Sequence, residues 1–221
     1  MLWYEKKNSD IVLSTRVRLA RNLDSVPFLS TLSISELKDT CKYIADTIES
    51  CDFEGFSLRR IEMETLGEYE IYAMVERHII SPNFALKPEG RILMLSDDES
   101  VSIMIGEEDH IRIQVIDSGL CLKKCYEICD YIDTQISKKI KFAFDERLGY
   151  LTECPTNLGT GMRASVMLHL PVLNYNGELK NIAETVGKIG LTFRGFYGEG
   201  SDSSACIYQL SNQITLGVSE E

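Results

Sequence analysis

Apolar residues recur at helical spacing in several parts of the chain. Ser33-Ile34-Ser35-Glu36 is a capping-box pattern, in which Ser and Glu satisfy free backbone N–H groups at the start of a helix. The apolar positions after it share one helical face and are Leu37, Cys41, Ile44 and Ile48. Further helices are predicted over residues 65–78, 120–136 and 179–188, the first of these ending before Ser81-Pro82.

Extended runs lie before and between these helices. Charged and apolar residues alternate over residues 14–21, and further strands are predicted over residues 91–95, 101–105, 110–116, 163–170, 191–194 and 206–210, with extended segments flanking residues 145–149. Gly106-Glu107-Glu108-Asp109 joins two of these runs, which predicts a hairpin with a charged tip. The strands outnumber those of a strict β-α-β alternation. The pattern therefore predicts an α+β fold, an antiparallel β-sheet flanked by helices.

Length and charge restrict the class of protein. The 221 residues contain no internal repeat or low-complexity linker, so we expect one domain over residues 1–221. No apolar run approaches the roughly 20 residues that cross a bilayer, and the N-terminus lacks the layout of a signal peptide, so we expect a cytoplasmic protein without membrane contact. The net charge of −11 argues against direct nucleic-acid binding and is compatible with a basic substrate.

The seven cysteines support the same compartment. Their number is odd and no CxxC pair occurs, unlike the disulfide framework of a secreted protein. Cys121, Cys125 and Cys129 recur every four residues in a predicted helix. They form either a metal or redox cluster or, as we favour, small apolar side chains on a buried helix face.

The common nucleotide-binding motifs are absent. The chain has no GxxxxGK[ST] loop, no GxGxxG after a strand, and neither HRD nor DFG. A bound triphosphate would then be held by arginines, because a planar guanidinium pairs with phosphate oxygens at two points. Arg16 and Arg18 share one face of a strand, and glycines that permit close ligand approach lie near Arg163 and Arg194. Taken singly, each arginine is more commonly a surface or salt-bridge residue.

Four blocks in this order resemble the ATP:guanido phosphotransferase family, which includes arginine and creatine kinases. The blocks are residues 14–18, 107–112, 154–165 and 194–199, and the run CPTNLGTGMRAS is especially specific. Three longer runs resemble the bacterial protein arginine kinase branch of that family: DIVLSTRVRLARNL, DDESVSIMIGEEDHIRIQ and IYQLSNQITLG. The resemblance covers essentially the whole chain and implies the phosphagen kinase catalytic domain, a fold similar to that of glutamine synthetase.

The resemblance also implies a role for each matched residue. The arginines that match the family's phosphate clamp are Arg16, Arg18, Arg112, Arg163 and Arg194. Glu108 and Glu199 match the two acidic residues that grip the guanidinium, and Cys154 matches the cysteine beside the reacting nitrogen. His78 aligns with a family histidine near the nucleotide base or ribose. From the residues alone, we favour a solvated tip for residues 107–109 and a buried thiol for Cys154. For His78, a satisfied histidine at a helix end is the open alternative.

The implied reaction is transfer of the γ-phosphoryl group of ATP to the guanidinium of arginine residues in proteins. Mg²⁺ would be held by nucleotide oxygens and water, without a protein metal site. The alternatives are a small-molecule guanidine kinase acting on a substrate such as free arginine, and a non-catalytic nucleotide-binding regulatory module. Implied partners are basic protein substrates, a Clp protease system and a zinc-finger activator, within a stress response.

The chain also departs from the family pattern. Small-molecule phosphagen kinases carry a helical domain of about 100 residues before the catalytic domain, and the residues before Ser14 leave no room for it, which fits an open site. Gly106 replaces a usual Asn. Protein arginine kinases usually continue into a helical domain for dimerisation and phosphoarginine recognition. This sequence stops at Glu221 without an RDxxRA motif, so we expect a piece of a longer protein or a short relative.

Overall fold

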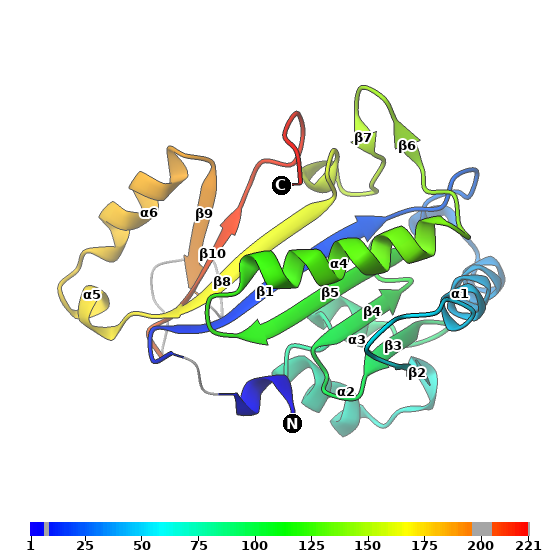
Figure 1. The fold of residues 1–221 in the computed structure, drawn as a ribbon, viewed down its shortest axis with the longest axis horizontal. Coiled ribbons are helices and arrows are strands. Elements are labelled where there is room, and N and C mark those ends of the chain that lie inside the picture. Colours follow the sequence, from blue (N-terminus) through cyan, green and yellow to red (C-terminus); the bar gives the residue numbers. More distant parts are fainter. Residues whose placement is uncertain (7–8, 196–204, 221) are drawn as a thin grey trace.

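The computed structural model describes residues 1–6, 9–195 and 205–220 (Figure 1). Its main sheet has eight strands in the order β2-β3-β4-β5-β1-β8-β10-β9, and all neighbours are antiparallel. These strands are β1 Val12–Arg21, β2 Leu58–Glu62, β3 Ile92–Ser96, β4 Val101–Ile105, β5 Ile111–Ser118, β8 Met162–His169, β9 Leu191–Gly195 and β10 Ile207–Asn212. A separate pair consists of β6 Phe144–Asp145 and β7 Gly149–Tyr150. The predicted antiparallel α+β fold is confirmed.

Helices flank this sheet on both faces. The α-helices are α1 Ile34–Glu49, α2 Glu68–Glu76, α3 Pro82–Leu86, α4 Leu122–Ser137, α5 Pro171–Tyr175 and α6 Leu179–Gly187. Short 3-10 turns are η1 Trp3–Glu5, η2 Leu29–Thr31, η3 Met63–Thr65 and η4 Pro155–Asn157. The predicted capping box is confirmed, since the Glu36 backbone N–H donates to Ser33 Oγ and the Ser33 N–H donates to Glu36 Oε2. The helix predicted over residues 65–78 is shorter, with a 3-10 turn in front of α2.

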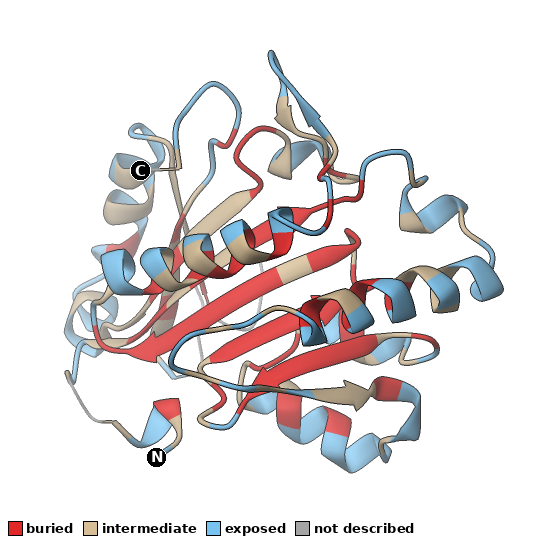
Figure 2. Ribbon diagram, turned by 45° about the vertical axis from the view of Figure 1, so that its right-hand side comes forward, coloured by how far each residue is buried: buried red, intermediate tan, exposed pale blue. Residues whose placement is uncertain are grey.

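Alternation along the strands separates two apolar cores. Val17 and Leu19 of β1 face the side covered by α1 and α4, where they join Cys41 and Ile44 of α1. Neighbouring residues of β3 divide between the two faces, since Met94 joins that core while Leu93 packs with α2 and α3 on the opposite face. Figure 1 shows α4 running across β1 and β5, and Figure 2 shows the burial concentrated along the central strands. The face of β1, β8 and β10 opposite α4 is left for polar side chains.

The cysteines of α4 lie on its buried face. Cys125 and Cys129 are fully buried, and Cys129 Sγ lies 3.5 Å from the Val17 carbonyl oxygen. Burial raises the pKa of both thiols above its usual value. The expectation that Cys121 shares this buried face is wrong, because Cys121 precedes the first residue of α4 and is only half-buried. Its Sγ lies 3.8 Å from that of Cys125. Among the described residues, no group of three or more His, Cys, Asp or Glu side chains is arranged to hold a metal ion.

Arg21 anchors the end of β1 rather than facing the polar side. Its side chain is fully buried, with Nε 3.0 Å from Asp133 Oδ1 of α4 and Nη2 2.8 Å from Glu220 Oε1. Its Nη1 donates to the Thr160 carbonyl, and its guanidinium lies 3.5 Å from the centre of the Tyr150 ring. These contacts tie the segment between β7 and β8 to the centre of the sheet. Within the described part of the chain, no helix has the length and apolar composition needed to span a membrane.

Candidate active site

Five arginines project from the sheet face opposite α4. Arg18 of β1 lies directly across from Arg163 of β8, and Ala20 lies across from Arg112 of β5. Because paired residues point to the same side and alternate residues share a face, Arg16, Arg18, Arg112 and Arg163 emerge together. Arg194 of β9 reaches the same face through its pairing with Gln209 of β10. Residues from widely separated parts of the sequence thus form one cationic surface.

The arginines repel one another in a partly buried setting. Burial, followed by the charges of Arg163 and Arg112, lowers the pKa of Arg16 to about 10. Burial and the neighbouring guanidinium groups lower the pKa of Arg18 well below its usual value, and burial, then Arg194 and Arg112, lowers that of Arg163. The Nε atoms of Arg18 and Arg163 are buried without a hydrogen-bond partner. A polyanion placed here would gain charge-assisted bonds and relieve the repulsion, so the site fits a nucleoside triphosphate.

Side chains not singled out from the sequence complete this surface. Arg16 Nη2 donates to Gln209 Oε1 at 3.3 Å, and Arg163 Nη2 donates to Ser211 Oγ at 3.2 Å. Gln209 and Ser211 occupy alternate positions of β10, inside the run IYQLSNQITLG. Their spacing in the sequence could have predicted that they lie on one face of the strand, because residues two apart on a strand share a face.

The hairpin between β4 and β5 brings two carboxylates to Arg112. Glu107 Oε1 lies 2.7 Å from Arg112 Nη1, and Glu108 Oε2 lies 2.9 Å from Nη2. The Glu107 carboxylate also accepts bonds from Ser81 Oγ at 2.5 Å and from the Glu108 backbone N–H at 2.6 Å. The side chain of Glu107 is 1% exposed and that of Glu108 is 40% exposed. Glu107 therefore positions the hairpin, whereas Glu108 remains accessible to a substrate.

The solvated tip that the residues alone favoured is wrong for most of this hairpin. Asp109 and His110 are fully buried. Asn22 Nδ2 and the Glu153 backbone N–H both donate to Asp109 Oδ1, at 2.6 Å and 2.8 Å. The His110 N–H donates to Asn22 Oδ1, and His110 Nδ1 accepts from the Leu23 N–H. These bonds join the hairpin to the end of β1 and to the segment that carries Cys154.

Cys154 approaches the carboxylate end of the arginine surface. It precedes the turn η4, is half-buried, and its Sγ lies 3.0 Å from Thr156 Oγ1. Asn157, at the end of η4, has its Nδ2 3.5 Å from Glu108 Oε2. The structure therefore brings the Cys154 turn, Glu108 and Arg112 together. Glu199, the second predicted carboxylate, lies outside the described residues.

His78 lies at the other end of the arginine surface. It follows α2 with a backbone φ of 61°, and its carbonyl accepts a bond from Gln114 Nε2 at 2.8 Å. It lines a small cavity together with Arg16, Ser165 and Gln209. The half-buried His78 thus lies near the Arg16 end of the arginine surface.

We expect His78 to make folding stability depend on pH. Burial, and then the charge of Arg16, lowers its pKa from 6.5 to about 4, so the folded state binds fewer protons than the unfolded state between these values. Stability should therefore fall as the pH drops through this window. Asparagine tolerates a positive φ, so His78→Asn should keep the backbone conformation. We expect this variant to lose up to about 3 kcal/mol less of its free energy of unfolding over this pH range than the unmodified chain loses. Urea unfolding of both proteins at pH 7 and pH 4.5 measures the change in the free energy of unfolding. The same change in His78→Asn as in the unmodified chain would contradict the role given to His78.

Comparison with known proteins gives consistent matches. The family model described as ATP:guanido phosphotransferase, C-terminal catalytic domain, matches residues 39–221. A protein-arginine kinase of Clostridium acetobutylicum is 46% identical over 97% of this chain and 63% of its own length. One of Caldanaerobacter subterraneus subsp. tengcongensis is 44% identical over 100% of this chain and 65% of its own length. The chain thus spans less than two thirds of these relatives.

Solved structures show the same fold. The duplicated taurocyamine kinase of Schistosoma mansoni, with bound transition-state analogue components, superposes with a TM-score of 0.83 at 32% identity, over 96% of this chain and 30% of that chain. Lombricine kinase superposes with a TM-score of 0.80 at 25% identity, over 99% of this chain and 64% of its own. Together with the arginine surface and its paired carboxylates, these matches show that the chain belongs to the ATP:guanido phosphotransferase family.

Proposed function

We propose that this chain transfers the γ-phosphoryl group of ATP to the guanidinium of arginine residues in proteins. The observation that carries the proposal is the meeting of five arginines with Glu108 and the Cys154 turn on one sheet face. The 46% identity to a protein-arginine kinase supports the choice of substrate within the family. We also propose that residues 1–221 act as one catalytic domain, since strands from both ends of the sequence share one sheet.

Phosphate binding would fall to the arginines. Their planar forks pair with phosphate oxygens, and the partly buried setting strengthens each charge-assisted bond. Phosphoryl transfer needs little covalent chemistry from the protein, because positioning and charge stabilisation supply most of the rate. Mg²⁺ would neutralise phosphate charge when bound. Glu107 and Glu108 are both engaged with Arg112, so the metal would take its ligands from phosphate oxygens and water.

The acceptor guanidinium would be oriented by the carboxylate end of the site. A protonated guanidinium is a poor nucleophile, and a carboxylate that accepts one of its protons makes a nitrogen lone pair available. We propose Glu108, whose side chain is 40% exposed, for this role, with Glu199 as its partner. As the nitrogen–phosphorus bond forms, the bond from the γ-phosphorus to the bridging oxygen breaks and ADP leaves. Cys154 would help to orient the cation beside the reacting nitrogen.

We also propose a cytoplasmic location and partner proteins for this chain. All seven cysteines are free, which suits a reducing compartment such as the cytoplasm. Family resemblance alone supports the proposed partnership with a Clp protease system and a zinc-finger activator in a stress response. Co-purification of either from cells that express a tagged form of this chain tests the partnership.

The decisive experiment offers three acceptors to the chain with Mg-ATP: a basic protein, the same protein with its arginines replaced by lysine, and free arginine. Mass spectrometry under non-acidic conditions, which preserve the nitrogen–phosphorus bond, should find phosphoarginine only on the first. Phosphorylation of free arginine alone would establish the small-guanidine kinase. Nucleotide binding without transfer to any acceptor would establish the regulatory module.

A further inference from the structure

A cavity of about 800 Å³ opens beside the start of β1 and the ends of β5 and β8. Its wall includes Trp3 and Tyr4 of η1, Ser14 of β1, His78 and Met167. The volume lies within the range of about 300–1,000 Å³ typical of small-molecule sites. None of the sequence blocks that resemble the family includes Trp3 or Tyr4.

This cavity continues toward the arginines. It shares Ser14, His78 and Met167 with a smaller cavity that is also lined by Arg16 and Gln209. Glu108 and Arg112 lie at the opposite end of the surface, where Arg112 pairs with Ala20. Ser14 and Ala20 are separated along β1 by roughly 20 Å, at about 3.3 Å per residue. A nucleotide with its γ-phosphate near Arg112 would therefore direct its nucleoside toward Ser14 and the larger cavity.

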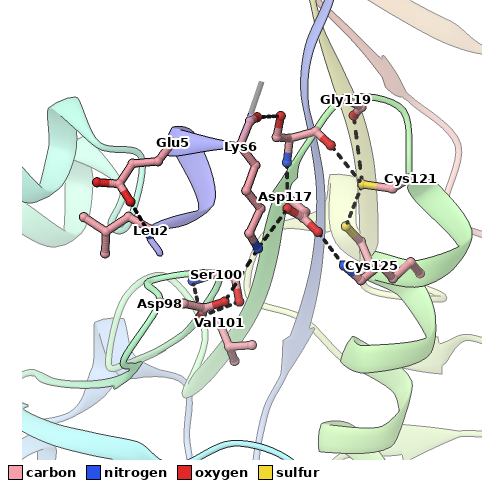
Figure 3. A network of polar contacts seen from close by, with 12 residues as sticks. Leu2, Glu5, Lys6, Asp98, Ser100, Val101, Asp117, Gly119, Cys121 and Cys125 are labelled. Atoms are coloured by element: carbon pink, nitrogen blue, oxygen red, sulfur yellow. Dashed lines mark hydrogen bonds and ion pairs between the residues drawn. The ribbon is translucent and has the colours of Figure 1, made fainter. Parts of the chain in front are cut away.

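The N-terminal segment that forms one wall is held in place by several bonds (Figure 3). The Trp3 N–H donates to the Asp98 carbonyl at 3.1 Å. Lys6 Nζ lies 3.6 Å from Asp117 Oδ1 at the end of β5 and 4.0 Å from Asp98 Oδ2, and Ser118 Oγ donates to the Lys6 carbonyl. Trp3 is therefore fixed against the sheet rather than free at a chain end.

The wall has the chemistry that a nucleobase needs. Trp3 is 6% exposed, and its indole packs edge-on against the Tyr4 ring, with ring centroids 5.6 Å apart. Its Nε1–H is buried without a hydrogen-bond partner. A planar base gains stacking energy from an aromatic wall and can offer ring-nitrogen acceptors to an indole N–H. The neighbouring Ser14 hydroxyl and His78 ring suit the hydroxyl groups of a ribose.

We propose that η1 is part of the nucleotide site and that Trp3 forms the wall against which the adenine base packs. The inference rests on the proposed use of ATP. It adds a base-binding element that lies outside the arginine surface and comes from the start of the chain. Trp3 determines the affinity for the nucleoside, whereas the arginines determine that for the phosphates.

Because Trp3 is the only tryptophan, its fluorescence reports on this site directly. Titration with ADP should change the emission of Trp3 with a saturable dependence on concentration. Inorganic tripolyphosphate, which carries the phosphates without a base, should bind but change the emission far less. Equal changes for ADP and tripolyphosphate, or no change with ADP at concentrations that calorimetry shows to saturate the protein, would overturn the proposal.

Substitution of Trp3 distinguishes its contribution to base binding from the contribution of the arginines to phosphate binding. Trp3→Ala should weaken ADP binding on the order of 10-fold, the loss expected for one base–aromatic stack, and leave tripolyphosphate affinity unchanged. Trp3→Phe, which keeps an aromatic ring, should retain most of the affinity for ADP. Tyr43→Ala on the exposed surface of α1 is the matched control and should bind both ligands normally. Unaltered tripolyphosphate binding also shows that the variant is folded.

The outcomes distinguish this inference from the proposed function. Normal ADP affinity in Trp3→Ala, combined with arginine phosphorylation by the unmodified chain, would overturn only the role of Trp3. An ADP-dependent change in Trp3 emission and weakened ADP binding in Trp3→Ala, without phosphorylation of any acceptor, would support the nucleotide wall and overturn the kinase function.

Discussion

Glu108→Gln is expected to slow phosphorylation of a basic protein by about 10²-fold or more, because one substitution removes both guanidinium orientation and proton acceptance. Glutamine keeps the shape and hydrogen-bonding capacity of the side chain but carries no charge. ATP affinity should change little, since Glu107 still holds Arg112 at 2.7 Å. Single-turnover phosphorylation, with ATP affinity determined in parallel, makes the measurement.

Glu127→Gln is the control for this substitution. Glu127 is an exposed residue of α4, on the sheet face opposite the arginines, so its loss of charge should leave turnover unchanged. Glu199→Gln should behave like Glu108→Gln if both carboxylates grip the guanidinium. Near-normal turnover in Glu108→Gln would show that Glu108 is structural and that the mechanism assigned to it is wrong.

Arg18→Met is expected to abolish phosphoryl transfer and yet to stabilise the ligand-free protein. Burial and neighbouring arginines lower the pKa of Arg18, so its charged form is disfavoured in the folded state. Replacing it with an apolar side chain of similar length removes this cost, which we expect to add about 1–2 kcal/mol to the free energy of unfolding. The thermal midpoint should rise by roughly 2–4 °C for each kcal/mol.

Calorimetry with and without ADP tests both parts of this expectation. The midpoint of Arg18→Met should rise without ADP, and the additional rise that ADP gives the unmodified chain should be largely lost. Arg59→Met, on the exposed surface of β2, should change neither quantity appreciably. A lower midpoint for Arg18→Met without ADP would mean that Arg18 serves the fold rather than ligand binding.

Arg163→Lys should weaken phosphate binding more mildly, because a point charge cannot replace the planar fork.

Local patterning predicted much of the fold. The capping box at Ser33 and the apolar face after it predicted α1, and alternation over residues 14–21 predicted β1. The elements missed were β2, α3 and α5. The sequence of β2, LRRIE, lacks strict alternation, and α3 and α5 have five residues each, too few to show a helical period or to be stable without tertiary packing.

Part of the candidate site could likewise be predicted from the sequence, and part depends on tertiary contacts. Strand periodicity placed Arg16 and Arg18 on one face, and nearby glycines pointed to Arg163 and Arg194. Family resemblance supplied Arg112, Glu108 and Cys154. The sequence alone did not indicate that Glu107, Asp109 and His110 are buried, because their partners are distant along the chain. Asn22, for example, lies 87 residues from Asp109. Charged residues at a hairpin are ordinarily solvated, and only a partner from another element makes their burial favourable.

The sequence by itself indicated which residues can perform the chemistry and that Arg16 and Arg18 share one strand face, because alternation is a local property of the backbone. The tertiary structure decided which of them meet. Arg18 and Arg21 stand three residues apart in one motif, yet Arg18 joins the cationic surface and Arg21 is neutralised by Asp133 and Glu220. Those carboxylates lie 112 and 199 residues away, so the different environments of the two arginines arise only when the sheet and α4 assemble.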